Sequence, residues 1–326
     1  MRPETPYANL SPDMVLAAID AAGYCADGRV LALNSYENRV YQVGIEAGDP
    51  LVAKFYRPGR WTDAAILEEH AFARELAALE IPVVAPLDLA GVTLHAHAGF
   101  RYALFPRRGG RWPELGTADD RQWLGRFLGR IHQAGRAAAF AHRSRLEVGE
   151  LGRKSRDFLL RGRWLPDYLA PKYEALTEAL IEEVERLAEG WRGARLARIH
   201  GDCHRGNILW TDAGPHFVDL DDCSTGPAVQ DLWMLLAGDA EEMRAQLSDI
   251  LEGYERFLPF DRRELALIEP LRALRMIHYS AWIARRWSDP AFPRAFPWFA
   301  ETRYWEDHYR ALEEQLAAVE APPLEL

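Results

Sequence analysis

The spacing of apolar residues changes period twice along the first third of the chain. Residues 11–22, SPDMVLAAIDAA, open on a capping serine and a proline and are followed by glycine, so they predict a short helix. Residues 29–57 are apolar, β-branched and aromatic runs with a turn signal between them, the pattern of a three-stranded meander. Residues 63–80 return to helical spacing, and residues 81–89 and 92–106 predict two or three further strands.

The rest of the chain is mostly helical in pattern. A connector rich in Gly, Arg and Pro at 107–116 precedes a T-x-x-D cap and a helix over 117–135. Helical spacing recurs at 171–189, at 229–257 and through much of 264–287. A strand-rich first third followed by a helix-rich remainder predicts the α+β fold class.

The length of the chain predicts two lobes. A chain of 326 residues exceeds one ordinary hydrophobic core. We assign an antiparallel sheet plus helix to an N-terminal lobe, residues 1–106, and a mostly helical C-terminal lobe to residues 107–326.

Composition and charge restrict the location and the partners. With 48% hydrophobic and 11% aromatic residues the chain has the apolar content of a folded protein, and no apolar run reaches the eighteen or so residues of a membrane span. A net charge of -10 argues against nucleic acid and anionic membranes as partners. Three cysteines without a CxxC pair, and a start without a signal-peptide pattern, predict a cytoplasmic protein without disulfides. We also expect a monomer.

One stretch, HGDCHRGN at residues 200–207, concentrates polar side chains. A zinc site needs four ligands, usually in close pairs, and His200, Cys203 and His204 have no second pair with them. A polar turn is the plain alternative, since glycine and asparagine form turns. The sequence that follows favours a catalytic loop over both.

A β-hairpin is predicted directly after this stretch, from an apolar strand, a TDAGP turn and a second apolar strand. Its two ends lie close together, so Asp202 and Asn207 are expected near Asp219. Two carboxylates and an amide supply oxygen ligands, which Mg²⁺ prefers and which substrate phosphates commonly complete. We therefore expect a magnesium site at the mouth of the hairpin.

The spacing of these residues matches a loop used in phosphoryl transfer. In protein kinases, H-R-D-x-x-x-x-N places a base aspartate five residues before a metal-binding asparagine, and a second metal-binding aspartate follows on the next strand. Here Asp202 stands five residues before Asn207, and Asp219 follows twelve residues later. Glycine replaces the arginine, the form typical of aminoglycoside and choline kinases. The loop predicts a kinase that uses ATP and Mg²⁺, with Asp202 orienting the acceptor hydroxyl.

A kinase of this kind also needs a lysine for the nucleotide phosphates, and Lys54 is the candidate. Lysine occurs only three times in the chain, and VAKF around Lys54 resembles the V-A-I-K strand of protein kinases. Its partner would be Glu68 or Glu69 on the next helix. Glu69 is favoured because it shares a face with Phe72 and Leu76. A solvent-facing lysine with surface glutamates is the structural alternative.

The loop that would cover the phosphates is LNSYENRVYQV, between the first two strands. It has no glycine, unlike the G-x-G-x-x-G loop of protein kinases, but its hairpin-turn residues can present N–H groups and a hydroxyl to a phosphate. We predict Ser35 as an ATP contact and expect adenine at the connector, near residues 104–107.

Asp231, in GPAVQDLWMLL, begins an apolar helix. A carboxylate at a helix terminus is the plain interpretation. The functional one is an aspartate that braces the backbone of the catalytic loop, and we predict this supporting role.

These residues also carry a family resemblance. In three segments, HGDCHRGNILW, FVDLDD and GPAVQDLWMLL, the chain resembles the aminoglycoside phosphotransferase and choline kinase superfamily. The fold of that superfamily is the two-lobed protein-kinase-like fold. The chain also resembles the bacterial stress response kinase A family of serine/threonine protein kinases, which is also called YihE or RdoA. This resemblance is carried by LNSYENRVYQV, VAKFYRPGRW, ILEEH, RMIHYSAWIARRWSDPAFPRAFPWF and YWEDH. The resemblance extends over residues 7–315.

The resemblance implies a role for each residue of the motif. Asp202 would be the proton acceptor, Asn207 and Asp219 the Mg²⁺ ligands, and Ser35 an ATP contact. Nucleotide would bind in the first lobe, and the second would hold the catalytic loop and the acceptor. The resemblance also implies phosphorylation of protein serine or threonine in cells under stress. Asp219 heads DLDD where protein kinases have DFG, so a DFG flip is not assumed.

The residues alone do not identify the molecule that accepts the phosphoryl group. Residues 272–287 carry Arg, His and Trp at three- to four-residue steps, either a solvated helix edge or a face for an anionic or aromatic acceptor. A protein kinase would label itself or another protein, whereas a small-molecule kinase of the choline, homoserine or aminoglycoside type would need a hydroxylated metabolite. A degenerate module would bind ATP without turnover, but the intact motif argues against it. We predict a serine/threonine protein kinase.

Overall fold

The chain, described by a computed structural model over residues 6–188 and 195–326, packs as two compact units. The first unit comprises Met1–Gly116, Phe140–Arg143 and His204–Cys223, and the second comprises Thr117–Ala139, Ser144–Cys203 and Ser224–Leu326. Packing thus groups the connector and the hairpin with the N-terminal sheet. The functional lobes 1–106 and 107–326 stay a prediction.

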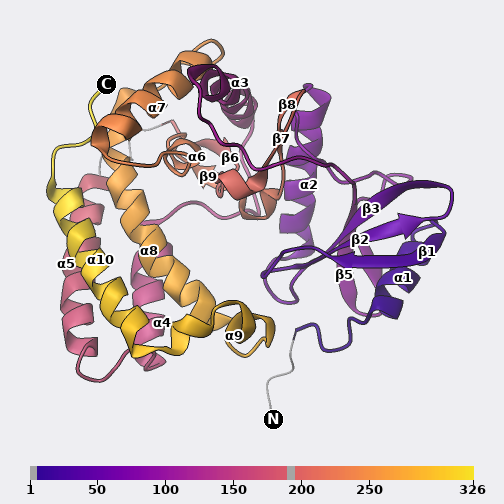
Figure 1. Ribbon diagram of the computed structural model, residues 1–326, viewed down its shortest axis with the longest axis horizontal. Coiled ribbons are helices and arrows are strands. Elements are labelled where there is room, and N and C mark those ends of the chain that lie inside the picture. Colours follow the sequence, from indigo (N-terminus) through magenta and orange to yellow (C-terminus); the bar gives the residue numbers. More distant parts are fainter. Residues whose placement is uncertain (1–5, 189–194) are drawn as a thin grey trace. The chain divides into compact units, whose positions relative to one another are not determined.

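The first unit is built on a five-stranded antiparallel sheet in the order β1–β2–β3–β5–β4 (Figure 1). The elements of this unit, in chain order, are α1 (Pro12–Ala21), β1 (Ala26–Ala32), β2 (Arg39–Ile45), β3 (Gly48–Phe55), α2 (Asp63–Ala78), β4 (His95–His97), β5 (Phe100–Pro106), η3 (Arg205–Asn207), β7 (Ile208–Thr211), β8 (Gly214–Phe217) and η4 (Leu220–Asp222). The predicted first helix, meander, second helix and late hairpin are all confirmed.

The alternation of side chains along β3 assigns its two faces. Leu51, Ala53 and Phe55 are buried in a core that β3 shares with α1. Lys54 stands between them in the sequence and therefore points to the opposite face, where α2 supplies its partner. The strand thus delivers one charged side chain to the α2 side of the sheet.

Residues 81–89 do not form the strand that their apolar character predicts. They make isolated bridges, one of them between Val83 and Phe217. Pro82 and Pro86 lack an N–H group and cannot donate to a ladder, so a regular strand is interrupted. Two strands, β4 and β5, follow instead.

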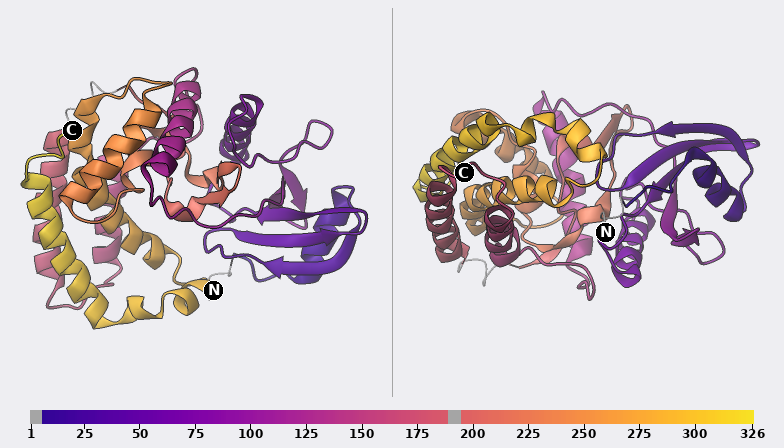
Figure 2. Two further views of the ribbon diagram at one scale, coloured as in Figure 1. Left: turned by 45° about the horizontal axis from the view of Figure 1, so that its top comes forward. Right: turned by 90° about the horizontal axis from the view of Figure 1, so that it is seen from below.

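The second unit is mainly helical. Its elements, in chain order, are α3 (Ala118–Gly135), the π-helical turn η1 (Gly149–Arg153), α4 (Lys154–Arg161), α5 (Ala170–Ala188), β6 (Ala197–Ile199), β9 (Ser224–Gly226), α6 (Gln230–Trp233), α7 (Ala240–Tyr254), η5 (Arg262–Leu267), α8 (Ile268–Arg285), α9 (Ala291–Ala295), η6 (Pro297–Ala300) and α10 (Thr302–Glu320). Helices α8 and α10 lie side by side and share a core with α4 and α5 (Figures 1 and 2). In the described residues, no helix is both long and apolar enough to cross a membrane.

Two predicted helices of this unit need correction. The pattern over 229–257 forms two helices rather than one, because Gly238 adopts φ 96° and Asp239 opens α7 with a capping box. The pattern from 264 begins in the 3₁₀ turn η5 before α8. The last residue of the predicted helix at 171–189 lies outside the described residues.

Candidate active site

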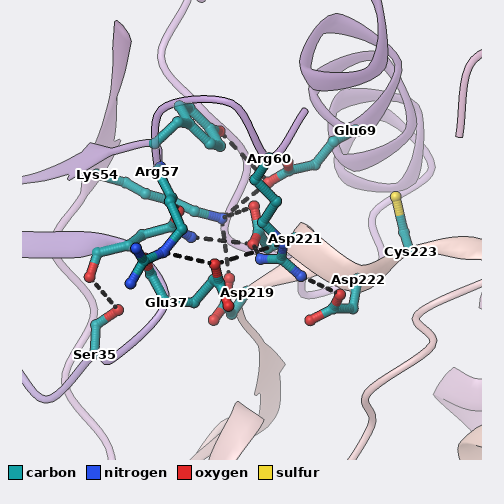
Figure 3. A network of polar contacts seen from close by, with 12 residues as sticks. Ser35, Glu37, Lys54, Arg57, Arg60, Glu69, Asp219, Asp221, Asp222 and Cys223 are labelled. Atoms are coloured by element: carbon teal, nitrogen blue, oxygen red, sulfur yellow. Dashed lines mark hydrogen bonds and ion pairs between the residues drawn. The ribbon is translucent and has the colours of Figure 1, made fainter. Parts of the chain in front are cut away.

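Lys54 lies at the centre of a buried charged cluster in the first unit (Figure 3). Its Nζ lies 3.1 Å from Glu69 Oε1. It also lies 3.0 Å from Asp219 Oδ1 and 3.2 Å from Asp221 Oδ1. Burial alone would lower the pKa of Lys54, but the three carboxylates raise it well above its ordinary value. The lysine is therefore charged, and its three N–H donors face three carboxylates.

The two adjacent glutamates of α2 have different partners. Glu69 is 3% exposed and forms the pair with Lys54. Glu68 accepts hydrogen bonds from the successive backbone N–H groups of residues 141–143, at 2.7 to 2.8 Å. Glu69 thus holds the lysine, while Glu68 fastens a distant segment of the same unit to α2.

The free energy of unfolding should depend on pH through Glu69. Burial raises the pKa of Glu69 from 4.5 to about 7, although Lys54 acts in the opposite direction. Between these values the unfolded chain gives up its proton first, so the contribution of Glu69 to stability is largest below pH 4.5 and decreases as the pH rises towards 7. The expected loss is about 3 kcal/mol.

Glu69→Gln carries no titrating carboxyl and should lack this component. Chemical denaturation of both proteins across the window from pH 4.5 to 7 gives the difference directly. Parallel stability curves for the wild type and the variant would contradict the assignment, whereas converging curves at the acidic end would support it.

Asp221, for which the motif spacing predicts no role, has three partners in the cluster. Its carboxylate pairs with Lys54 and Arg60, and its Oδ2 accepts from Asn38 Nδ2 at 3.1 Å. The residue is 2% exposed. Burial alone would raise the pKa of Asp221, but Arg60, Lys54 and Arg143 lower it well below its ordinary value. Asp221 is therefore an ionised carboxylate inside the unit.

Ser35 lies in the turn between β1 and β2. Its Oγ donates to the carbonyl oxygen of Asn38 at 3.1 Å. The side chain of Asn38 in turn accepts from the N–H of Arg57 at 3.1 Å and donates to Asp221. These bonds fasten the glycine-free turn to the segment after β3 and to the segment after β8.

Asn207 and Asp219 flank the hairpin of β7 and β8. The carbonyl oxygen of Asn207 accepts from Val218 N at 3.0 Å, which brings it next to the start of the Asp219 segment. Asp219 adopts φ 58°, a left-handed conformation that aspartate tolerates better than most residues, and its side chain is 49% exposed. Both residues carry oxygen ligands of the kind Mg²⁺ prefers.

The zinc alternative finds no support in the cluster geometry. Within residues 6–188 and 195–326, no group of three or more His, Cys, Asp or Glu side chains is placed to hold a metal ion. Burial, with the nearby carboxylates Asp231 and Asp202, raises the pKa of the Cys203 thiol well above its ordinary value. Cys203 is therefore a protonated, buried thiol in the metal-free protein.

In the second unit, Asp231 braces the loop that carries Asp202. Its two carboxylate oxygens accept from the backbone N–H groups of His200 and Gly201 at 2.7 and 2.8 Å. His132 Nε2 lies 3.0 Å from the same fully buried carboxylate. This confirms the predicted supporting role of Asp231.

Asp202 has a side chain that is 23% exposed, and its Oδ1 lies 2.8 Å from Arg275 Nη1 of α8. The sequence marked the arginine-rich pattern of this helix but did not connect it with Asp202. Of the predicted site residues, the structure brings Lys54, Glu69 and Asp219 into direct contact within the first unit. Asp202 is described within the second unit.

Comparison with known proteins adds independent information. Residues 29–268 match the phosphotransferase enzyme family. Stress response kinase A of Escherichia coli strain K12 is 47% identical over 98% of this chain and 97% of that protein. Serine/threonine protein kinase RdoA of Salmonella typhimurium is 46% identical over the same shares. A solved amicoumacin kinase in complex with AMP-PNP, Ca²⁺ and Ami shares the fold, with a TM-score of 0.71 at 22% identity, covering 96% of this chain and 94% of that one.

Proposed function

Because the chain belongs to the phosphotransferase enzyme family and, within it, to the stress response kinase A family, we propose that it transfers the γ-phosphoryl group of ATP to a serine or threonine hydroxyl of a protein. Family membership makes the chain an ATP-dependent kinase and confirms the predicted α+β, aminoglycoside phosphotransferase-like fold class. The proposal concerns the protein acceptor and the role of each residue.

The observation that supports the use of ATP is the buried set of ion pairs around Lys54. A strand lysine held by a helix glutamate, here Glu69, is the arrangement with which kinases bind nucleotide phosphates. The half-exposed carboxylate of Asp219 and the amide of Asn207 would hold Mg²⁺ together with the phosphates. When bound, the metal would neutralise charge on the transferred group. Ser35 is proposed to contact ATP from its anchored turn.

Asp202 is the proposed proton acceptor. Its carboxylate is partly exposed, and the loop beneath it is held by Asp231. The acceptor oxygen would form a bond to the γ-phosphorus as the bond to the bridging oxygen of ADP breaks, and the hydroxyl proton would pass to Asp202. Positioning of the hydroxyl is the main contribution of this carboxylate.

The proposal places the nucleotide site in the lobe of residues 1–106 and the catalytic loop and acceptor site in the lobe of residues 107–326. It also places the protein in the cytoplasm, where ATP is available and where three free cysteines are stable. A protein acceptor is supported by the 45–47% identity to relatives that are named stress response kinases and a serine/threonine protein kinase. The chain itself is proposed as one acceptor.

Incubation of the purified protein with γ-labelled ATP and Mg²⁺ tests the proposal, alone, with myelin basic protein, and with choline, homoserine or an aminoglycoside. Label is expected on serine or threonine of protein. Lys54→Met should reduce it at least about a hundredfold, because the phosphates lose their cationic partner. Lys172→Met, at an exposed lysine of α5, is the matched control and should retain activity. Turnover that requires a small alcohol, with no labelled protein, would replace the proposed acceptor class.

A further inference from the structure

The ion pair between Asp202 and Arg275 fixes one oxygen of the proposed proton acceptor. Asp202 Oδ1 is enclosed by protein, and Arg275 Nη1 lies 2.8 Å from it. The contact is an ion pair rather than an aligned hydrogen bond. An acceptor hydroxyl would therefore meet the other carboxylate oxygen, Oδ2.

Arg275 has more donor capacity than Asp202 uses. A guanidinium group carries five N–H donors, and the side chain of Arg275 is 42% exposed. Within the described residues, Asp202 is its single ion-pair partner. Arg272, one turn earlier, differs because it pairs with Glu269 and lies over the ring of Trp233. Arg275 can thus bind a second anion while it keeps Asp202 in place.

The charge of α8 favours an anionic partner. Residues 270–288 contain four arginines and no acidic residue, in a chain whose net charge is -10. Helical spacing puts Tyr279, Trp282 and Arg286 on the same face as Arg275. Tyr279 is 40% exposed and stacks on Trp282, with the two ring centroids 5.7 Å apart. The guanidinium carbon of Arg286 lies 5.4 Å from the centroid of the Trp282 ring. This face, which we call the α8 basic face, combines cationic and aromatic groups beside the proton acceptor.

We propose that Arg275 selects acceptors that carry an anionic group, a carboxylate or a phosphate, next to the phosphorylated hydroxyl. It does so while holding Oδ1 of Asp202, so the same side chain positions the proton acceptor and binds the anionic group of the substrate. The inference rests on the proposed transfer to protein. It makes acidic or already phosphorylated protein segments the preferred substrate class.

Four serine peptides that differ only at the positions flanking the serine test this selectivity. The flanking residue is glutamate, phosphoserine, alanine or arginine, and kcat and KM are measured for each with γ-labelled ATP. The wild type should prefer the anionic peptides over the alanine peptide at least about tenfold in kcat/KM, the effect of one charge-assisted pair. The glutamate and phosphoserine arms distinguish the two sources of the anion.

Arg275→Gln should abolish this preference by raising KM for the anionic peptides. It should also lower kcat on the alanine peptide about tenfold, because Asp202 loses its positioning partner. Arg275→Lys keeps the charge and should recover part of the preference. Arg303→Gln is the matched control, since Arg303 is 86% exposed and pairs with a carboxylate of its own helix, and both quantities should stay unchanged. Equal melting temperatures confirm that the variants are folded.

Two results would overturn the inference, and they differ from failure of the proposed function. A wild type without anionic preference, or an Arg275→Gln variant that keeps it, removes Arg275 from acceptor selection. If whole proteins but no peptides are labelled, the ratio of kcat/KM for phosphorylated casein to that for myelin basic protein serves the same purpose. Labelling of a small alcohol with no labelled protein or peptide rejects the proposed function instead.

Discussion

Asp202→Asn is expected to lower kcat for phosphoryl transfer by about three orders of magnitude while ATP binding is retained. Removal of a positioned general base typically costs a hundredfold to ten-thousandfold, and an amide cannot take up the hydroxyl proton. The loop should keep its conformation, because its backbone N–H groups are held by Asp231 rather than by Asp202. The lost ion pair with the half-exposed Arg275 contributes little to stability.

Single-turnover kinetics with γ-labelled ATP, together with equilibrium binding of ATP, measure the two effects separately. Asp212→Asn is the matched control, since Asp212 is an exposed aspartate in the turn between β7 and β8, and it should behave as the wild type. Retention of more than about a tenth of the wild-type kcat in Asp202→Asn would assign proton transfer to another group.

Elements with a clear local pattern could be predicted from the sequence. The meander and the late hairpin follow from apolar runs bounded by turn residues, and both form as predicted. The strand predicted at 81–89 does not form. Its prediction followed the apolar character of the segment, but each of its two prolines lacks the N–H group that would donate a hydrogen bond to a neighbouring strand. The single helix predicted at 229–257 is divided, because α6 already ends at Trp233 and Gly238, with its positive φ, precedes the cap Asp239 of α7.

The site was predictable only as far as motif spacing and helix faces extend. The pairing of Lys54 with Glu69 rather than Glu68 follows from the apolar face of α2, and the structure shows this pairing. Asp221 was missed because its partners are remote: Asn38 lies 183 residues away and Arg60 lies 161 residues away. No periodicity encodes contacts at such distances. The signals present were the second acid of DLDD, Asp221, and the second arginine of FYRPGRW, Arg60.

Asp221→Ala is expected to lower the free energy of unfolding by about 3 to 5 kcal/mol, because removal of one carboxylate from a buried set of ion pairs leaves the buried cations less well compensated. Lys54 and Arg60 would both lose a carboxylate that is 3% exposed. The pKa of Asp221 is depressed, so its stabilising effect is present above the ordinary aspartate pKa of 3.8 and is lost as the pH falls below it. Guanidinium denaturation at neutral pH should therefore show the full difference.

Asp222→Ala is the matched control for this change. Asp222 also pairs with Arg60, but its side chain is 49% exposed, so its loss should cost no more than about 1 kcal/mol. Equal destabilisation by the two variants would show that burial of the Asp221 carboxylate adds nothing to its contribution. The double variant Asp221→Ala with Arg60→Gln also removes one of the two cations that lose the buried carboxylate. It should therefore be less destabilised than the sum of the single variants, which separates loss of the ion pair from a cavity effect.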